Sequence, residues 1–394
     1  MAHDLQIYDG RERALVRTAD TLLAPLRWLP RAAPRATRRV LLLRLERIGD
    51  LLMAIDAIRD AQADWPDAQI DLAVGSWNEP IARLIPGVSN VLVADAPWLA
   101  RGSAASWPHL ITTARRWRTR GYDLVVNFEP DIRSNFLTWL TRAPARVGYG
   151  TGGGGAFLTE ALAYEPSHHV ATNARALIAY AAGRVHEPTD VRPASAALMP
   201  AVDATTRAAN LVAGASRPLV GVHASGGRLS KQWHLDRFAA VARRLAAERG
   251  ATIVLTGSPT DRAMVDEVAS ALDGVLVIRA DGALDLPSLA ALLEQLDVFI
   301  TSDTGPMHLA AAMRTPVVAL FGPSDPKRYG PRAAIERIVR VDLPCSPCGQ
   351  VRLPPVRCRG HVPDCMDGIS VDAVVARALD ALDARAAAGG RERA

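Results

Sequence analysis

The first apolar segment that fits a buried strand is followed closely by an aspartate. Residues 40–45 read Val-Leu-Leu-Leu-Arg-Leu, and Arg47-Ile48-Gly49-Asp50 come shortly after them. A carboxylate at a strand end can take a proton from a hydroxyl group, which is general-base chemistry. Aspartate is also a favoured cap of a helix N-terminus, and an apolar-periodic helix is predicted near residues 50–62. Asp50 is therefore a candidate base whose alternative role is to cap that helix.

A turn of small residues that runs on to a lysine follows a second predicted strand. After residues 218–223 come Ser225-Gly226-Gly227, and Lys231 lies six positions beyond Ser225. Small residues let a backbone approach a phosphate group, and the Ser225 and Lys231 side chains can donate hydrogen bonds to its oxygens. This pattern favours a phosphate site, and the alternative for Lys231 is a solvated surface lysine.

A third strand end combines an acid, a hydroxyl, a glycine and a histidine. The predicted strand 297–301 is followed by Asp303-Thr304-Gly305-Pro306-Met307-His308. Pro306 suits the first position of a helix, and the exposed amides of that helix start would bind an anion such as a diphosphate. His308 lies on the first turn, where it could reach the same anion. In the alternative interpretation Asp303 or Thr304 only caps the helix and His308 packs in the core.

A fourth strand end carries Asp261, which follows the predicted strand 251–256. Acidic residues at such positions can bond the hydroxyl groups of a ribose, and helix capping is the alternative. Neither half of the chain has a GxGxxG turn after its first strand. A dehydrogenase-type dinucleotide site is therefore not supported.

All four cysteines, Cys345, Cys348, Cys358 and Cys365, fall within 21 residues. The spacing of the first pair suits a thiolate metal clip, whereas the second pair is spaced more loosely than in a standard zinc ribbon. His361 is a candidate to replace one of the cysteines as a metal ligand. A zinc or iron ion held here would be structural, because four protein ligands leave no open position. Free packed thiols and a regulatory disulfide are the alternatives.

Composition places the chain among globular proteins. Of its 394 residues, 49% are hydrophobic and 22% are charged, which excludes a disordered chain. No apolar run approaches the ~18–20 residues of a membrane-spanning helix, and the N-terminus shows no secretion signal. Four cysteines are too few for a disulfide-built scaffold, so the expected location is the reducing cytoplasm.

The positive charge is concentrated at the N-terminus. The net charge is +5, and residues 1–39 hold eight arginines against four acids, which is +4 of that total. Because the rest of the chain is nearly neutral, a nucleic-acid-binding face is not expected. Leucine, tryptophan and arginine recur at roughly helical spacing between residues 14 and 29. This fits a helix on a membrane surface or, alternatively, a helix packed on its own domain.

Apolar runs of strand length alternate with helical stretches in two successive parts of the chain. Further strands are predicted over 70–74, 90–93 and 123–128, and then over 274–278 and 316–321. This alternation is typical of parallel sheets with crossover helices, so we expect an α/β chain of two doubly wound domains. Ligands bind beyond the carboxyl ends of strands in such sheets, which is where the residues above lie.

Proline-rich residues near 186–200 break the alternation and mark a domain boundary. The predicted organisation is a basic arm (1–38), a first domain (39–185), a linker (186–216), a second domain containing the four cysteines (217–369) and a C-terminal helix (370–394). The glycine run at 152–155 is too uniform for a phosphate-binding fingerprint. It is predicted to be a flexible loop, able to order over a substrate.

Taken together, these motifs resemble those of glycosyltransferase family 9, the lipopolysaccharide heptosyltransferase family. The resemblance rests on the Arg44 to Asp50 turn, on Lys231-Gln232-Trp233 and on the Asp303 to His308 segment, in that order, over about residues 39–340. It implies a GT-B fold, in which two Rossmann-like domains face a central cleft. It also implies inverting transfer from a nucleotide sugar, usually ADP-L-glycero-D-manno-heptose, with no catalytic metal.

The resemblance assigns a role to each matching position. Asp50 is similar to the catalytic base on the acceptor side, and Lys231 and His308 complete the expected catalytic set. The expected donor contacts are Ser225, Gly226, Lys231, Asp261, Asp303, Thr304, Gly305 and His308. Of these, Lys231 and the Ser225 region would contact the diphosphate, and Asp261 would contact the ribose or nucleoside.

The acceptor implied by the resemblance is a lipid-linked sugar of the lipopolysaccharide core. A cytoplasmic protein that touches the inner face of the inner membrane would fit such an acceptor. The four-cysteine segment, however, resembles that of a branch which includes protein heptosyltransferases with a cysteine-bound iron. A protein O-heptosyltransferase and a GT-B nucleotide-sugar epimerase or hydrolase therefore remain alternatives. A degenerate, non-catalytic binding protein is disfavoured because the charged site residues are present, and the oligomeric state stays open.

Overall fold

The structure, a computed structural model, describes residues 5–7, 9–28, 36–99, 105–184 and 198–391. The chain divides into two compact units, residues 1–190 and 191–394, and each contains one parallel sheet. Their boundary falls inside the range predicted for a linker. Parts of the predicted arm and linker, at 1–4, 8, 29–35 and 185–197, lie outside the described residues.

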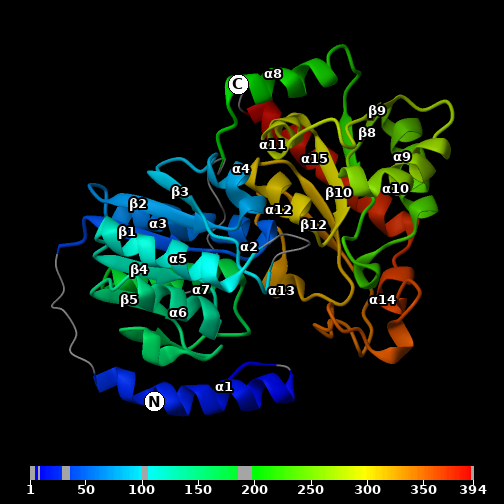
Figure 1. Ribbon diagram of the computed structural model, residues 1–394. Coiled ribbons are helices and arrows are strands. Elements are labelled where there is room, and N and C mark those ends of the chain that lie inside the picture. The colour runs from blue at the N-terminus through cyan, green and yellow to red at the C-terminus, as the bar shows by residue number, and fades with distance from the viewer. Residues whose placement is uncertain (1–4, 8, 29–35, 100–104, 185–197, 392–394) are drawn as a thin grey trace. The chain divides into compact units, whose positions relative to one another are not determined.

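The first unit is built on a six-stranded parallel sheet with the order β3-β2-β1-β4-β5-β6 (Figure 1). Its strands are Arg39–Leu43 (β1), Gln69–Val74 (β2), Asn90–Val93 (β3), Leu124–Asn127 (β4), Ala145–Tyr149 (β5) and Glu160–Leu162 (β6). Its α-helices are Gly10–Leu23 (α1), Ile48–Met53 (α2), Ile55–Asp64 (α3), Glu79–Ala82 (α4), Trp107–Trp117 (α5), Ile132–Leu140 (α6) and Val170–Ala181 (α7). Short 3-10 helices are Ala24–Trp28 (η1), Ser76–Asn78 (η2), Arg118–Arg120 (η3) and Gly155–Phe157 (η4).

The second unit repeats this plan, with the strand order β12-β11-β10-β7-β8-β9. Its strands are Leu219–His223 (β7), Thr252–Leu255 (β8), Val277–Arg279 (β9), Val298–Ser302 (β10), Val317–Leu320 (β11) and Glu336–Val339 (β12). Its α-helices are Val202–Leu211 (α8), Leu235–Arg249 (α9), Arg262–Ser270 (α10), Leu286–Gln295 (α11), Gly305–Ala312 (α12), Pro326–Tyr329 (α13), Asp364–Asp367 (α14) and Val371–Arg391 (α15). Its 3-10 helices are Leu229–Lys231 (η5), Pro259–Asp261 (η6) and Val356–Cys358 (η7).

Both sheets have the strand order of a Rossmann fold. Numbered from its own first strand, each reads 3-2-1-4-5-6. In such sheets ligands bind beyond the carboxyl ends of the strands, at the point where the strand order reverses. That switch point lies between β1 and β4 in the first unit and between β7 and β10 in the second. The prediction of two doubly wound α/β domains is therefore confirmed.

Helices on both faces explain why the central strands are apolar throughout. In the first unit α3 packs on α7, and α5 packs on α6; in the second, α9 contacts α10 and α15, and α8 contacts α11. The core between the first sheet and the α5–α6 layer contains Leu41, Leu43, Leu110, Trp117, Val125 and Leu137. A strand covered on both sides reads as a continuous apolar run, which is why β1 and β7 are recognisable in the sequence.

Three strands and two helical segments differ from the predicted elements. The edge strands β6 and β12, and β5 beside β6, were not predicted. Strand β6 has only three residues, and none of these three strands is buried along its whole length, so none reads as a continuous apolar run. Helix α8 lies within the predicted linker 186–216, where it packs against α11 as part of the second unit. The helix predicted near 50–62 is two helices, α2 and α3, which meet at Ala54.

The glycine run at 152–155 is buried and packs against α1 and the turn before α6. The prediction of a flexible loop is therefore wrong. A Cβ on Gly152 would lie 1.6 Å from the carbonyl oxygen of Pro130. One on Gly153, whose φ is +86°, would lie 2.2 Å from Cγ1 of Val16 in α1. Gly154 donates its backbone N–H to Oδ1 of Asp20 at 2.6 Å. Glycine is required here because α1 and the turn before α6 approach the loop backbone closely.

Helix α1 therefore packs on its own unit, along the outside of the first domain (Figure 1). Val16 is the buried residue of this helix, whereas Leu15 and Leu22 are 72% and 77% exposed. Within the described ranges, no helix has the length and apolarity needed to span a bilayer.

Candidate active site

Asp50 lies in the first turn of α2, at the switch point of the first sheet. Helix α2 begins at Ile48 with Arg47 as its N-cap, so Asp50 is at the third helical position and is not the N-cap that was predicted as its alternative role. Its Oδ2 accepts a hydrogen bond from the backbone N–H of Arg47 at 3.1 Å, and its side chain is 29% exposed. The carboxylate thus stabilises the helix start while remaining accessible to a substrate hydroxyl.

Arg44, the first residue after β1, is buried beside this carboxylate and is 3% exposed. Its guanidinium lies 3.0 Å from Oε2 of Glu46 and 3.6 Å from Oδ1 of Asp50. It also donates to the carbonyl oxygens of Asp50, at 3.1 Å, and Phe128, at 2.9 Å. Burial works against the charge, but the carboxylates of Glu46, Asp50 and Glu129 outweigh it and raise the pKa of Arg44. A buried cation is retained because it is both paired and hydrogen-bonded.

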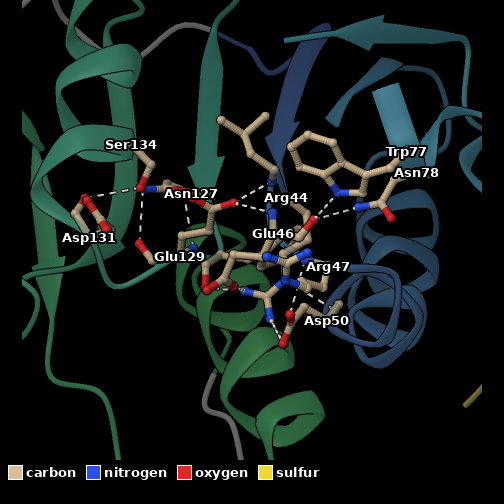
Figure 2. Close-up of polar contacts among 12 residues, drawn as sticks. Arg44, Glu46, Arg47, Asp50, Trp77, Asn78, Asn127, Glu129, Asp131 and Ser134 are labelled. Atoms are coloured by element: carbon tan, nitrogen blue, oxygen red, sulfur yellow. Dashed lines mark hydrogen bonds and ion pairs between the residues drawn. The ribbon is translucent and has the colours of Figure 1, made fainter. Parts of the chain in front are cut away.

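Glu129 follows β4 and faces the same loop from the neighbouring strand (Figure 2). It is 1% exposed, and its Oε1 accepts the backbone N–H of Leu45 in a short bond and that of Glu46 at 3.0 Å. Its Oε2 is buried and bonds no described group. Burial, reinforced by the nearby negative charge of Glu46, raises the pKa of Glu129 to about 8. This carboxyl group therefore holds its proton more tightly than an ordinary glutamate.

Every backbone N–H of the loop from Arg44 to Arg47 has a partner. Arg44 donates to the carbonyl of Ala73, the next two residues donate to Glu129, and Arg47 donates to Asp50. On the acceptor side of the loop, the carbonyl of Glu46 receives bonds from the side chains of Trp77 (2.7 Å) and Asn78 (2.8 Å). Figure 2 shows these contacts converging on the loop. The loop that leads to Asp50 is thus held by groups from two neighbouring strand ends, those of β2 and β4.

Arg44, Glu46 and Glu129 were not among the predicted site residues. Glu129 comes directly after the predicted strand 123–128, so the same strand-end rule that selected Asp50 would have selected it. No local pattern indicates that Arg44 is buried, because an arginine at a strand end is usually solvated. Its burial follows from the pairing of β1 with β4.

Lys231 and Asp303 meet at the switch point of the second sheet. The Nζ of Lys231 donates to the carbonyl oxygen of Asp303 and lies 3.3 Å from its Oδ2. The Lys231 side chain is 18% exposed, so it is not the solvated surface lysine of the alternative interpretation. The structure brings together two residues that sequence analysis placed on separate strand ends.

The turn that carries Ser225 and Gly226 is closed by its own side chains. Gly226 donates its N–H to Oε1 of Gln232 at 2.8 Å, so this amide is already bonded. A Cβ on Gly226 would lie 2.6 Å from the carbonyl oxygen of Lys231. Glycine is needed here because the backbone of the turn folds back on itself. The predicted approach of this turn to a phosphate stays a prediction. Ser225 is buried and receives the N–H of Gly227 at 3.3 Å.

Helix α12 starts at Gly305, with Thr304 as N-cap and Pro306 in the first turn. The Thr304 side chain does not cap the helix and instead shares a hydrogen bond with the Thr301 hydroxyl at 3.2 Å. A helix start without a side-chain cap offers its amides to an anion. His308 is 6% exposed on the first turns of this helix. The predicted placement of these residues at a helix start is confirmed, and their contact with a donor stays a prediction.

Asp261 lies beside His223, which ends β7. Its carboxylate accepts the N–H of Ser258 at 2.8 Å and the Ser258 hydroxyl at 2.6 Å, so it caps the turn before α10. Burial opposes ionisation, but the bonds from Ser258 and Ser225 outweigh it and lower the pKa of Asp261. Burial lowers the pKa of His223, whose Nδ1 lies 3.2 Å from both oxygens of Thr256. A carboxylate therefore lies next to a neutral imidazole. The bonds to Ser258 confirm the capping role of Asp261.

The four cysteines are all free thiols. Cys345 and Cys348 are exposed, Cys358 is half-buried and Cys365 is buried. Burial, with the other three thiols nearby, raises the pKa of Cys365 to about 11. Across the described ranges no group of three or more His, Cys, Asp or Glu side chains is arranged to hold a metal ion. The described side chains of this segment are therefore not arranged as a metal site. Metal binding here stays a prediction from the chemistry of the thiol groups.

Comparison with known proteins points to one family. Residues 111–353, more than half of the chain, match the family model described as Glycosyltransferase family 9 (heptosyltransferase). The lipopolysaccharide core heptosyltransferase OpsX of Haemophilus influenzae is 22% identical over 311 residues, which cover 78% of this chain and 85% of that protein.

Solved structures share the fold at low sequence identity. The structure of Escherichia coli ADP-heptose lipopolysaccharide heptosyltransferase II has a TM-score of 0.72 at 21% identity and covers 87% of this chain and 98% of its own. The iron-containing dodecameric glycosyltransferase TibC of enterotoxigenic E. coli has a TM-score of 0.52 at 14% identity and covers 90% and 78%. These similarities show that the architecture of the two units is that of known glycosyltransferases.

Proposed function

This chain belongs to glycosyltransferase family 9, the heptosyltransferase family, and on that premise we propose which sugar it transfers and which residues transfer it. The proposed donor is ADP-L-glycero-D-manno-heptose, and the proposed acceptor is a lipid-linked sugar of the lipopolysaccharide core. The names of the relatives support this choice, since one is a lipopolysaccharide core enzyme and another an ADP-heptose enzyme. The residue assignment rests on the charged groups at both switch points. Asp50 follows β1, and Lys231 forms an ion pair with Asp303, which follows β10.

In the proposed reaction an acceptor hydroxyl oxygen attacks the anomeric carbon of the heptose. The bond from that carbon to the diphosphate breaks, and its electron pair leaves with ADP. Asp50 receives the hydroxyl proton, a step for which its partly exposed carboxylate is suited. Because attack and departure take place on opposite faces of the sugar, the anomeric configuration inverts. A general base of this kind contributes about 10²–10⁴ in rate.

Negative charge develops on the departing diphosphate, and the second unit supplies the groups that stabilise it. Lys231 offers an ammonium, and the uncapped start of α12 offers backbone amides at Thr304 and Gly305. His308 on the same helix completes this set. The turn at Ser225-Gly226 and the carboxylate of Asp261 are the proposed contacts to the diphosphate and the ribose. Preorganised donors aimed at developing charge are usually the largest single contribution to such catalysis.

Donor binding by calorimetry tests the sugar and the donor site together. ADP-heptose, ADP, UDP-N-acetylglucosamine and GDP-mannose would be titrated into the wild type and into Lys231→Ala. Lys327→Ala is the matched control, because Lys327 is an exposed lysine on α13. We expect selective binding of ADP-heptose, weakened about 10–100-fold in Lys231→Ala only, since a hydrogen bond to a charged group contributes ~1.5–3 kcal/mol. Tight binding of another sugar nucleotide would discard the heptose assignment.

Turnover of Asp50→Ala tests the base separately from the donor site. We expect kcat to fall by about 10²–10⁴ while the affinity for ADP-heptose stays at the wild-type value. Full turnover of this variant would remove Asp50 from the role. Consumption of the donor without any acceptor would instead favour the alternative of an epimerase or hydrolase.

A protein acceptor is the second candidate, and the four clustered thiols are the observation that favours it. Offering the enzyme ADP-heptose with either lipid-linked core saccharide or purified candidate proteins separates the two acceptors. Mass spectrometry of the products would show a heptose mass on lipid for the main proposal. A heptose mass on protein alone would overturn it.

We further propose that the four-cysteine segment binds a structural zinc or iron ion. Burial and the three neighbouring thiols raise the pKa of Cys365, which a shared cation would offset, and thiolate donors suit both metals. Elemental analysis of the purified protein and of Cys348→Ser checks this. The proposal expects metal in the wild type that is lost in the variant, and a metal-free wild type contradicts it.

A lipid-linked acceptor also places the enzyme at the cytoplasmic face of a membrane. We propose that the outer face of α1 makes this contact, through the exposed Leu15 and Leu22 and the arginines of the arm. An amphipathic helix of this kind binds by burying apolar side chains among lipid headgroups, assisted by attraction to anionic lipids.

A further inference from the structure

Glu129 joins the two strand ends that form the switch point of the first sheet. It follows β4, and its carboxylate accepts the amides of Leu45 and Glu46 in the loop that leaves β1. Arg44 makes the reciprocal contact, from the β1 loop to the carbonyl of Phe128 at the end of β4. Each strand end therefore holds the other through a buried side chain. The same Arg44 reaches Asp50, through the carbonyl oxygen at 3.1 Å and the carboxylate at 3.6 Å.

We propose that Glu129 is a positioning residue for the reaction: it fixes the loop from Arg44 to Arg47 and thereby sets where the Asp50 carboxylate stands. This inference rests on the proposed role of Asp50 as the base. Glu129 itself is buried and is not expected to touch the substrate. Its contribution is to hold a loop that no regular secondary structure holds.

The hydrogen-bond requirements of the loop make Glu129 difficult to replace. Two consecutive backbone N–H groups, those of Leu45 and Glu46, converge on its Oε1. A buried N–H that loses its partner costs about 1–3 kcal/mol, so the loop would rearrange to find other acceptors. A shift of the loop moves the start of α2, and Asp50 is in the first turn of that helix. A displacement of 1 Å in a catalytic group can cost about 10²-fold in rate.

The charges around Glu129 agree with a neutral, structural carboxyl group. Glu46 and Asp131 raise its pKa by repulsion, Arg44 and the Leu45 amide lower it, and burial dominates. Both loop amides use Oε1, and the buried Oε2 bonds no described group. With Glu129 neutral, the charge of Arg44 is balanced by Glu46 and Asp50.

Steady-state kinetics of three Glu129 variants test the proposal. Glu129→Ala removes the acceptor of both amides, and we expect kcat to fall about 10–100-fold while the KM for ADP-heptose stays unchanged. Glu129→Gln keeps an oxygen at the same reach and should recover most of kcat. Glu129→Asp is one methylene shorter and should lie between the two. If the alanine variant does not fold, the aspartate variant provides the measurement.

Asp71 in β2 supplies the matched control. It is another fully buried carboxylate of the first unit, bonded to Tyr122 at 2.6 Å and to Arg120 at 3.0 Å, residues that precede β4. Asp71→Asn should lower the stability of the unit but leave kcat at the wild-type value at temperatures where the protein is folded. A merely structural role of Glu129 would make the two positions behave alike.

A double variant separates this inference from the proposed base. In an Asp50→Asn background, Glu129→Ala should cause little further loss of kcat, because the group it positions is gone. If Asp50→Asn is slow but Glu129→Ala and Glu129→Asp turn over like wild type, the positioning role is wrong and the base stands. If Asp50→Asn turns over normally, the proposed base fails first. Multiplicative losses in the double variant would also overturn the positioning role.

Discussion

Arg44 is the buried cation that pairs with the carboxylates at the first switch point. It faces the carboxylates of Glu46 and Asp50 directly and lies near Glu129, so three acids surround one guanidinium. One cation cannot balance three anions in a buried site, and the most buried acid, Glu129, is the one that holds a proton. With Glu129 neutral, Glu46 and Asp50 remain as the two carboxylates that pair with Arg44.

The raised pKa of Glu129 makes stability depend on pH. Between its ordinary value of 4.5 and about 8, the unfolded chain has lost this proton while the folded chain keeps it. Stability therefore falls as pH rises through that window, by on the order of a few kcal/mol, and this contribution levels off above it. Glu129→Gln does not titrate and should lose this part of the dependence, gaining stability relative to wild type from pH 5 to pH 8.

Urea unfolding at several pH values, followed by tryptophan fluorescence, measures this effect. Seven of the eight tryptophans precede residue 140, so the signal reports on the first unit. Parallel pH dependence of the wild type and Glu129→Gln would show that Glu129 ionises normally.

At the level of elements, side chains from other segments fix the loops that carry the candidate site residues. The β1–α2 loop is fixed by side chains from β2–η2 and β4, and the turn at Gly226 is fixed by Gln232. The glycine loop before η4 is fixed by α1. The β1–α2 loop and the glycine loop are held by partners distant in the chain, whereas Gln232 is six residues from Gly226. Such contacts are how a loop can place a reacting group.

Gly153→Ala should weaken the packing of α1 against the rest of the first unit. The substitution adds a Cβ 2.2 Å from Val16 at a φ of +86°, so it meets both a steric clash and a strained backbone. Gly183→Ala is the control, because its φ is +70° and nothing lies within 4 Å of the added Cβ. We expect about 1–2 kcal/mol of destabilisation for the control and ~1–3 kcal/mol more for Gly153→Ala. Equal losses in urea unfolding would mean that the packing of α1 adds nothing.

At the scale of the whole molecule, two units of the same topology each place charged groups at their own switch point. The first provides an exposed carboxylate and the second a lysine and a helix start, which are suited to an acceptor hydroxyl and a diphosphate respectively. The basic arm adds a surface with exposed leucines to the first unit.

Replacing the two exposed leucines of α1 tests the membrane contact. Leu15→Ser with Leu22→Ser should reduce binding to vesicles rich in anionic lipid, since each buried leucine contributes about 1.5–3 kcal/mol. Leu276→Ser, at a 64% exposed leucine of the second unit, is the control and should bind like wild type. Sedimentation with vesicles gives the readout. Unchanged binding of the double variant would exclude α1 as the contact.

The two α/β domains, and the strand ends followed by Asp50, Lys231 and Asp303, could be predicted from the amino-acid pattern alone. These features are local: a strand covered on both faces must be apolar along its length, and the residue that follows it must lie at the carboxyl edge. Which strand ends meet depends on the order of the strands in each sheet, which the local pattern does not contain. Glu129 bonds a loop 84 residues away, and Gly154 bonds Asp20 across 134 residues, because the strand order and the docking of α1 bring them together. Contacts over such separations depend on how the elements pack, and no local spacing records that packing.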